Sequence, residues 1–253
     1  MYKIPANTLF IGKKLVYVPE CHSTNTLAAE LADRESVVEG TVIITNNQYK
    51  GRGQRGNQWI SEPGKNLTLS LILKPSFLRA DQQFRLTQII ALAISDYSKE
   101  KTEKSVKIKW PNDVLINERK VCGILIENSI AGESIQTSIV GIGLNVNQAK
   151  FETTKATSLS LEANHEFDLQ TELSNLLQAL EVRFMQLRAG KLEELEADYL
   201  TNLYRRGENH RFKIANGELI GKITNIDKRG RLIVTTEKGE QHFDLKEISF
   251  ADY

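Results

Sequence analysis

The sequence predicts an α+β fold in two parts. A larger domain at residues 1–206 would hold a mixed sheet with helices packed on it, and residues 207–253 would form a small SH3-like β-barrel. Strand patterns cluster together between helix patterns, which is typical of α+β proteins and not of a regular βαβα alternation. Beyond Arg206 and Gly207 the chain changes to short alternating strands separated by turn dipeptides, the pattern of a small all-β domain.

The first helix is expected to begin near Thr24. Ser23, Thr24 and Asn25 are residue types that cap helices, and Leu27 and Leu31 follow at the i, i+4 spacing of one helical face. The first turn of this helix would present hydroxyl groups and free N–H groups.

Two strands and a long helix follow. Residues 41–47 are typical of a buried strand, and residues 66–73 alternate polar and apolar residues like a second strand. The glycine-rich stretch between them therefore joins strand to strand. Residues 82–100 place apolar side chains on one helical face, which predicts a core helix.

The next segment predicts a hairpin. Residues 106–128 read as a strand, a Pro-Asn-Asp corner, and a turn at residues 117–119 that leads into a second strand. Residues 134–147 add an apolar strand that ends in glycines.

Two helices and the barrel complete the chain. Asp168 caps a leucine-rich helix that ends at Gly190, and residues 191–204 continue as a second helix. The turn dipeptides of the C-terminal strands are Asn216-Gly217, Arg229-Gly230 and Lys238-Gly239.

Composition narrows the class of protein. The chain has 253 residues, 40% hydrophobic and 26% charged, with a formal net charge of +1, so it has no overall attraction to nucleic acid or membrane. The first residues are not an apolar leader, and Cys21, in a predicted loop, and Cys122, in a predicted strand, are the only cysteines. We therefore expect a reduced, cytoplasmic protein. The four histidines lack the spacing of a metal site, so no protein-held metal is expected.

Gly51, Gly53 and Gly56 form a literal Gly-x-Gly-x-x-Gly. A dinucleotide site needs these glycines to open a helix, with an acidic residue about 20 residues later, and neither is present. Lys74 on the next strand fits a kinase, but no His-Arg-Asp or Asp-Phe-Gly segment follows. A Walker A loop would need Gly-Lys-Ser/Thr, which is absent as well.

The glycine stretch is better interpreted as a flexible loop for an anionic ligand. Arg52 and Arg55 lie among the glycines, and Gln48 and Trp59 flank them. Guanidinium groups suit carboxylates and phosphates, and the aromatic ring suits a partly aromatic ligand.

Several motifs in order resemble those of the biotin protein ligases, and the resemblance covers nearly the whole chain. The motifs are Ser23-Thr24-Asn25, Gln48, the Gly-Arg-Gly loop, KWPND at residues 109–113, RKVCGILIE at residues 119–127 and GIGLNVN at residues 141–147. Lipoate ligases share a related catalytic fold, but the Gly-Arg-Gly and KWPND motifs favour biotin.

The resemblance implies a class II synthetase-like catalytic domain that uses ATP and Mg²⁺. Such an enzyme forms biotinyl-5'-AMP and then biotinylates a lysine of a biotin carboxyl carrier domain of a carboxylase. Since the first helix pattern begins at Thr24, we expect no N-terminal DNA-binding domain and no binding of nucleic acid. No membrane partner is expected, and the protein would be a monomer or a homodimer.

The resemblance also assigns roles to residues. The predicted biotin-binding residues are Ser23, Thr24, Asn25, Gln48, Gly51, Arg52, Gly53, Gln54, Lys109 and Gly123. The predicted nucleotide-binding residues are Arg55, Trp59, Asn112, Lys120 and Asn145. Arg52 and Lys109 would be catalytic, as cations that neutralise the reacting carboxylate and phosphate. Many family members have an arginine where this chain has Gln54, so one anchor of the loop differs.

Other interpretations remain open. A lipoate-type ligase, or a sensor that holds biotin or a nucleotide without turnover, would share parts of the pattern, although Lys109 favours an enzyme. The mixed charges of the C-terminal strands make a nucleic-acid-binding barrel the weaker alternative. Asp113 could accept the proton of the acceptor lysine, or it could be a structural residue in a salt bridge.

Overall fold

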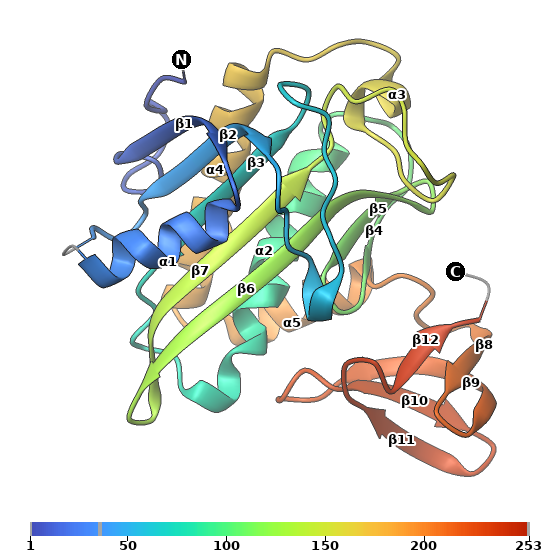
Figure 1. The fold of residues 1–253 in the computed structure, drawn as a ribbon. Helices are drawn as coiled ribbons and strands as arrows, with labels where there is room; N and C mark the ends of the chain where they lie inside the picture. Colours follow the sequence, from blue (N-terminus) through green and yellow to red (C-terminus); the bar gives the residue numbers. More distant parts are fainter. Residues whose placement is uncertain (1, 35–36, 252–253) are drawn as a thin grey trace.

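The computed structural model describes residues 2–34 and 37–251, apart from the side chains of Arg34 and Arg55. Its large sheet has seven strands in the order β1-β2-β3-β7-β6-β5-β4 (Figure 1). β1 runs parallel to β2 and the other neighbouring pairs are antiparallel, so the sheet is mixed, as predicted. The strands are β1 (Leu15–Cys21), β2 (Val42–Gln48), β3 (Leu67–Leu73), β4 (Val106–Lys109), β5 (Asp113–Ile116), β6 (Arg119–Ala131) and β7 (Ser134–Leu144).

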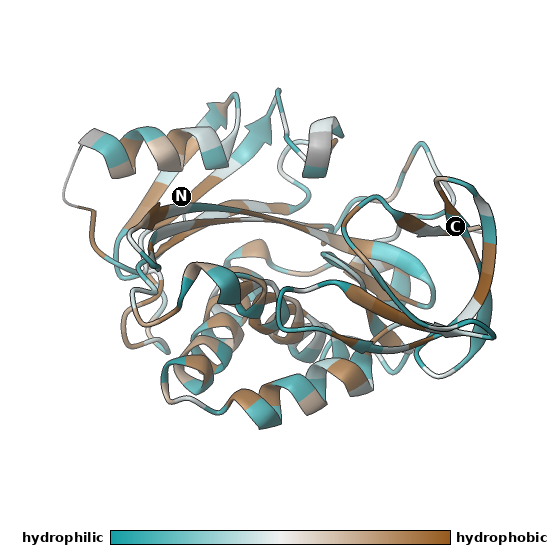
Figure 2. Cartoon of the chain, turned by 90° about the horizontal axis from the view of Figure 1, so that it is seen from below, coloured by the Kyte–Doolittle hydropathy of each residue, from teal (hydrophilic) through white to brown (hydrophobic). Residues whose placement is uncertain are grey.

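Helices cover both faces of this sheet (Figure 2). Because side chains alternate along a strand, Ile43 of β2 packs in the apolar cluster under α1, whereas Val42 and Ile44 pack with the helices of the opposite face. The helices are α1 (Thr24–Arg34), α2 (Phe84–Lys99), α3 (Leu159–Ala163), α4 (Leu169–Arg188) and α5 (Leu192–Asn202). α1 packs on one face, and α2 packs on the other with α4 and α5 behind it (Figure 1).

The helices predicted from periodicity are confirmed, and their ends follow capping chemistry. α1 begins at Thr24, as predicted. The side chain of Asp168 accepts a hydrogen bond from Thr171 N at 2.8 Å and so caps α4. Gly190 follows α4 with φ +75°, a conformation that glycine adopts without strain.

Two elements were not predicted. β1 contains Pro19 and lies at the edge of the sheet with mostly half-buried side chains, so its sequence lacks the alternation of an interior strand. The prediction that Cys21 lies in a loop is wrong, because Cys21 is the buried last residue of β1. α3 is a single short turn of helix whose start is capped by Ser158.

The C-terminal segment forms a second sheet, antiparallel throughout, in the order β11-β10-β9-β8-β12. Its strands are β8 (Asn209–Ile214), β9 (Gly217–Ile226), β10 (Leu232–Thr236), β11 (Gly239–Phe243) and β12 (Ile248–Phe250). The predicted boundary after residue 206 stays a prediction.

The turn between β9 and β10 contacts the larger part of the molecule. The indole Nε1 of Trp110 donates a buried hydrogen bond to Gly230 O at 2.9 Å. A Cβ at Gly230 would lie 2.3 Å from Cγ of Phe84, so only glycine fits this contact. The C-terminal sheet therefore braces the chain just after β4.

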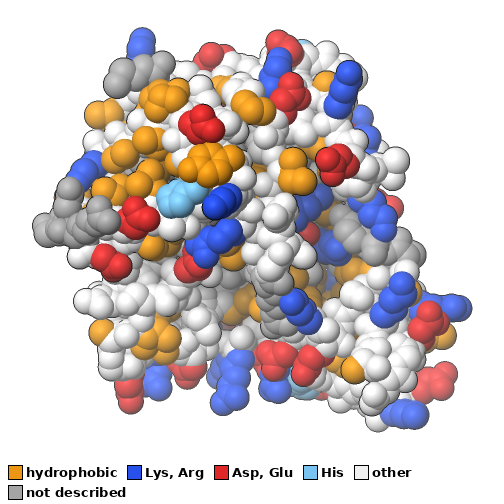
Figure 3. All heavy atoms as spheres, in the orientation of Figure 1, with side chains coloured by type: hydrophobic (Ala, Val, Ile, Leu, Met, Phe, Trp, Pro, Cys, Tyr) orange, Lys and Arg blue, Asp and Glu red, His pale blue; other side chains and the backbone are white. Residues whose placement is uncertain are grey.

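The face of the molecule in Figure 3 does not suggest one class of partner. On the face shown in Figure 3, basic and acidic side chains are interspersed. Among residues 2–34 and 37–251, no helix is both long and apolar enough to cross a membrane.

Candidate active site

The face of the large sheet under α1 contains a hollow between the strands and the start of the helix. Small or polar residues occupy this face where β3, β7 and β6 run side by side. One cross-strand row is Thr68, Gly143 and Gly123, and the next is Ser70, Gly141 and Leu125. Since these rows include three glycines, the sheet leaves room for the side chains that line the hollow, Asn25 over Gly141 and Trp59 over Gly123 and Gly143.

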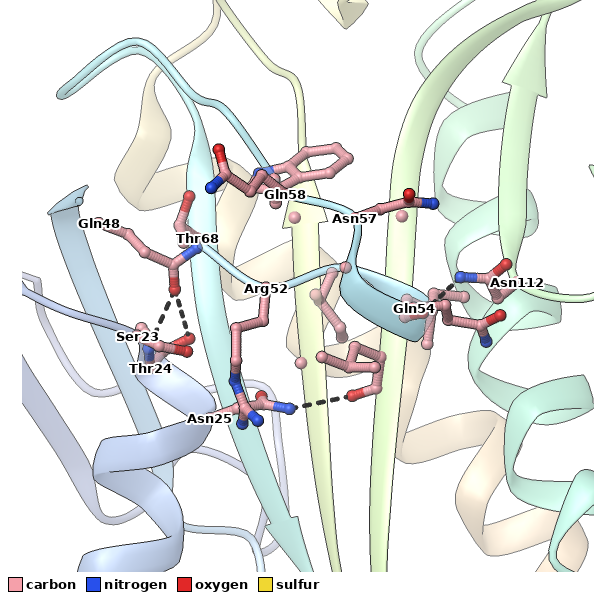
Figure 4. Close-up of a pocket in the computed structure, with 18 of the residues that line it drawn as sticks. Ser23, Thr24, Asn25, Gln48, Arg52, Gln54, Asn57, Gln58, Thr68 and Asn112 are labelled. Carbon is pink, nitrogen blue, oxygen red and sulfur yellow. Dashed lines mark hydrogen bonds between the residues drawn. The ribbon is translucent and has the colours of Figure 1, made fainter. Parts of the chain in front are cut away.

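A cavity of about 180 Å³ occupies this hollow (Figure 4). α1, β2, the glycine loop and the strands β3, β5, β6 and β7 all contribute to its walls. The predicted site residues that line it are Ser23, Thr24, Asn25, Gln48, Arg52, Gly53, Gln54, Trp59, Asn112, Lys120 and Gly123. Residues far apart in the sequence thus meet at one place.

The start of α1 forms one end of the cavity. Ser23 and Thr24 are each 3% exposed, and the backbone N–H of Thr24 donates to Gln48 Oε1 at 3.0 Å. Figure 4 shows the Gln48 side chain reaching from β2 to this helix start. Hydroxyl, amide and backbone groups are therefore concentrated in a desolvated corner, where polar groups of a ligand would find matched partners.

Asn25 is fixed by its neighbours on three sides. Its Nδ2 donates to Leu125 O at 3.2 Å and to Glu127 Oε2 at 2.8 Å, while its Oδ1 lies 2.6 Å from the hydroxyl of Ser70. A Cβ at Gly141 would lie 2.4 Å from that Oδ1, so the glycine makes space for the amide. Asn25 therefore acts as part of the cavity's scaffold, with both amide hydrogens already engaged.

The glycine loop folds into a tight turn beside the cavity. Trp59 N donates to Gly51 O at 3.1 Å and Gly53 N donates to Asn57 O at 2.7 Å, with a short 3₁₀ turn at Gln54–Gly56. A Cβ at Gly51 would lie 2.1 Å from Trp59 O, so this turn requires glycine there. Gly51 itself lines a neighbouring hollow with Tyr49 and Lys50, and is not among the described residues that line the first cavity.

The indole of Trp59 packs against two glycines of the sheet, Gly123 and Gly143. A Cβ at Gly143 would lie 2.3 Å from its Cε2, and one at Gly123 would lie 2.9 Å from its Cζ3. Its Nε1 is buried and has no hydrogen-bond partner among the described residues. Such a donor in a cavity wall is available to a ligand.

Trp59 also separates the first cavity from a second one of about 420 Å³. Lys120 lines both cavities, and its Nζ lies 5.5 Å from the centroid of the Trp59 ring. Asn145 and Phe151 line the second cavity but not the first. Asn145 is 3% exposed and its Nδ2 donates to Thr157 O at 3.0 Å, so it also fastens the loop that precedes α3.

Two cations on the cavity wall are paired with carboxylates of the sheet. Arg52 Nη2 lies 2.7 Å from Glu127 Oε2, and Lys120 Nζ lies 2.6 Å from Asp113 Oδ1. The salt bridge favours the structural interpretation of Asp113. Asn112 donates to Ile124 O at 2.7 Å, which holds the Pro-Asn-Asp corner against β6.

Lys109 lies next to the first cavity and not in its wall. Within the part of the chain that the structure describes, it is not among the residues lining the first cavity, but lines a third cavity of about 240 Å³ beside the C-terminal sheet. Gln54 and Asn57 line both cavities, so the two are neighbours. Burial lowers the pKa of Lys109 to about 8; Asp113 opposes this effect, and the nearby Lys120, Lys155 and Arg205 add to it.

Most of the predicted site residues thus line the first cavity, and the other described ones lie outside its lining. The roles predicted for Lys109 and Asn145 stay predictions, and the side chain of Arg55 lies outside the described residues. The two motifs that contain Lys109 and Lys120 do not indicate which of these lysines lines the first cavity. The contributions of Thr68, Ser70 and Glu127 were not predicted. For Thr68 and Ser70 the signal was a pair of polar residues at alternate positions of a buried strand.

Known proteins that resemble this chain in sequence and in structure include biotin ligases, and the matching family model is that of biotin and lipoate ligases. The profile described as the Biotin/lipoate A/B protein ligase family matches residues 17–145. The bifunctional ligase/repressor BirA of Bacillus subtilis is 32% identical over 250 residues, covering 97% of this chain and 75% of that protein. The biotin–[acetyl-CoA-carboxylase] ligase of Paracoccus denitrificans is 32% identical over 238 residues, covering 90% of this chain and 97% of that protein. The structure of the Aquifex aeolicus biotin protein ligase in complex with biotin and ATP has a TM-score of 0.78 at 28% identity, covering 94% of this chain and 98% of that chain.

Proposed function

We propose that this chain, which belongs to the biotin/lipoate A/B protein ligase family, activates biotin as biotinyl-5'-AMP and transfers the biotinyl group to a lysine of a carrier domain. Relatives named as biotin ligases, and the solved ligase with biotin and ATP, support an ATP-dependent biotin–protein ligase. The observation that carries the proposal is the first cavity. It joins a polar recognition corner to two cations, with a second cavity alongside.

The polar corner favours biotin over lipoate. The ureido ring of biotin has one carbonyl and two N–H groups, which can pair with the hydroxyls of Ser23 and Thr24 and the amide of Gln48. A dithiolane ring cannot make these hydrogen bonds, and each buried polar group left unpaired costs about 1–3 kcal/mol. The apolar thiophane ring of biotin would lie against the indole of Trp59.

Adenylation brings two anions together. A carboxylate oxygen of biotin attacks the α-phosphorus of ATP, a new P–O bond forms, and the bond to pyrophosphate breaks. With biotin in the first cavity and the nucleotide extending into the second, Lys120 would lie between them, because it lines both. Arg52 and Lys120 are therefore the cations that would stabilise the charge developing on the phosphoryl oxygens.

Mg²⁺ would enter with the phosphates of ATP. The described residues contain no group of three or more His, Cys, Asp or Glu side chains that could hold a metal ion. Mg²⁺ usually binds through substrate phosphates and one or two carboxylates, and keeps several waters. Asp113 lines the cavity and is the carboxylate suited to this contact.

In the second step the amine of the acceptor lysine attacks the acyl carbon, and the C–O bond to AMP breaks. A free lysine has a pKa of about 10.4, so the amine must lose a proton before it attacks. The salt bridge of Asp113 with Lys120 leads us to assign Asp113 as a counter-ion and not as the base. The glycine loop would cover the adenylate and exclude water until the carrier arrives.

The rest of the molecule is consistent with this role. The mixed sheet and the antiparallel C-terminal sheet fit the class II synthetase-like domain and SH3-like barrel that the family resemblance implies. We propose a biotin carboxyl carrier domain as the acceptor. Cys21 and Cys122 are both free and buried, which fits a reducing compartment such as the cytoplasm.

The direct test incubates the purified protein with biotin and Mg-ATP and measures pyrophosphate release, with lipoate as the matched control substrate. A carrier domain is then added, and its mass is measured before and after reaction. We expect pyrophosphate with biotin and not with lipoate, and the mass of one biotinyl group on one carrier lysine. Folded protein that releases no pyrophosphate would overturn the proposal, and release with lipoate alone would favour a lipoate-type ligase.

A further inference from the structure

Glu127 joins three separate segments of the molecule at the edge of the first cavity. Its Oε2 on β6 accepts hydrogen bonds from Asn25 Nδ2 of α1, at 2.8 Å, and from Arg52 Nη2 of the glycine loop, at 2.7 Å. Figure 4 shows the Arg52 side chain extending toward Asn25. A single carboxylate oxygen thus connects the sheet, the helix that begins at the polar corner, and the loop.

The connection continues into the recognition corner. The Oδ1 of Asn25 accepts a hydrogen bond from Ser70 Oγ at 2.6 Å, and the hydroxyls of Ser70 and Thr24 lie 2.8 Å apart. Ser70 is fully buried and Asn25 and Thr24 are each 3% exposed, so these side chains have little freedom to adopt other arrangements. The position of Arg52 is therefore coupled to the same network that orients Thr24.

The contact with Glu127 can hold the Arg52 guanidinium in place and still leave it able to bind a ligand. The two side chains are 40% and 46% exposed, and exposed ion pairs of this kind are weak. A guanidinium has five N–H donors, so one carboxylate does not exhaust it. An anionic ligand could bind the remaining donors, and less side-chain freedom would be lost on binding because Arg52 is already held.

We propose that Glu127 is a positioning residue, which holds Arg52 at the mouth of the cavity so that the guanidinium meets the carboxylate of the substrate. The inference rests on the proposed function, because it takes biotin as the carboxylate. The site for an anionic substrate would then include an acidic residue. Charge alone would predict that such a carboxylate weakens binding of the substrate.

The matched pair of variants is Glu127→Gln and Glu133→Gln. Glu133 belongs to the same β6–β7 hairpin and also pairs with an arginine, Arg79, at 3.0 Å, but neither residue lines the first cavity. Glutamine keeps the size of glutamate and can still accept from Asn25, so Glu127→Gln mainly removes the charge that holds Arg52. Both variants are expected to fold.

Two measurements separate positioning from a merely structural role. In calorimetry, Glu127→Gln should weaken biotin binding about fivefold, while the affinity for biotin carboxamide, which has no charge for Arg52 to meet, stays unchanged. In the ligand-free protein, hydrogen exchange at residues 51–59 should become faster in Glu127→Gln. Glu133→Gln should match the wild type in both experiments.

Each outcome has one meaning. Tighter biotin binding by Glu127→Gln would show that Glu127 merely repels the substrate, and equal weakening of both ligands would show a structural role; either result overturns the inference. Unchanged exchange at residues 51–59 overturns it whatever the ligand is. Wild-type protein that binds no biotin would instead overturn the proposed function.

Discussion

Lys120 is a residue on which adenylation is expected to depend strongly. It lines both cavities and lies 2.6 Å from Asp113, so its ammonium group is held where the two substrates would meet. We expect Lys120→Gln to lower the rate of pyrophosphate release by about 10²–10³-fold, since this is the usual cost of removing one electrostatic donor from a transition state. Biotin affinity should fall much less, because the polar corner remains.

The measurement is a comparison of pyrophosphate release and biotin binding in the same preparations. Lys191→Gln is the control, because Lys191 pairs with Glu194 on the surface near the start of α5, away from all three cavities. A normal adenylation rate in Lys120→Gln would remove Lys120 from the mechanism.

Lys109 should make stability depend on pH. Its pKa is about 8 in the folded protein and ordinarily 10.5, so between these values the unfolded chain binds more protons. Stability therefore rises with pH in this window, and burial of the charged amine costs free energy below pH 8. Lys109→Met should thus be more stable than the wild type at pH 7, by up to about 3 kcal/mol. Urea unfolding at a series of pH values should show this advantage shrinking from pH 8 to pH 10.5, and a constant difference would contradict the assigned cause.

Part of the candidate site could be predicted from the sequence, at residues whose type indicates their chemical role. Cap-type residues at Ser23 and Thr24 and the arginine among glycines indicated polar recognition and anion binding, and the structure brings them to one cavity. Glu127 could not be found, because its partners Asn25 and Arg52 lie on a helix and a loop distant in sequence. Its role depends on strand register, which no local pattern records.

At the scale of elements, the strongly periodic helices were predicted from the sequence, whereas the weakly periodic strand β1 was not. α4 buries one apolar face and α2 is buried all round from Ile89 to Ser95, and both carry strong apolar patterns from which their positions could be predicted. β1 is an edge strand with a proline, and its pairing with β2 becomes visible only in the folded sheet. The glycine loop was predicted as a loop, but its tight turn depends on the contact between Gly51 and Trp59.

This loop carries a prediction of its own, because Gln54 stands where many family members have arginine. Gln54 lines the first and third cavities, and Asn112 also lines the first (Figure 4). A neutral amide can hydrogen-bond the adenylate but adds no charge attraction, a difference of about 1 kcal/mol or several-fold in retention. Gln54→Arg should therefore release less biotinyl-adenylate, and Arg52→Ala should release more. Arg55→Ala should also release more, but less than Arg52→Ala.

Released adenylate can be measured as biotin attached to an unrelated protein rich in lysine. Equal labelling by wild type and all three variants would mean that the loop does not retain the intermediate. Lower labelling by Arg52→Ala must be corrected for its rate of adenylation, which pyrophosphate release gives in the same reaction.

At the scale of the whole molecule, the C-terminal sheet supports the site from a distance. Trp110 follows Lys109 and precedes the corner that carries Asn112 and Asp113, and its indole is hydrogen-bonded to Gly230 of the C-terminal sheet. The buried apolar side chains of the C-terminal sheet belong to the same cluster as those on the α2 face of the large sheet. Loosening this contact should therefore disturb the cavity wall formed by the corner, although no residue of the C-terminal sheet lines the first cavity among those described.

Two glycine variants can test this coupling. Gly230 and Gly239 both have positive φ, +90° and +102°, so alanine strains the backbone at either position. A Cβ at Gly230 would lie 2.3 Å from Phe84, whereas one at Gly239 would meet open space. Gly239→Ala is therefore the control for backbone strain, of about 1–2 kcal/mol, and Gly230→Ala adds the clash between the two parts. We expect a larger fall in Tm, faster hydrogen exchange at residues 109–113 and slower adenylation in Gly230→Ala alone. If both variants lose stability equally and adenylate biotin at the same rate, the C-terminal sheet does not brace the site.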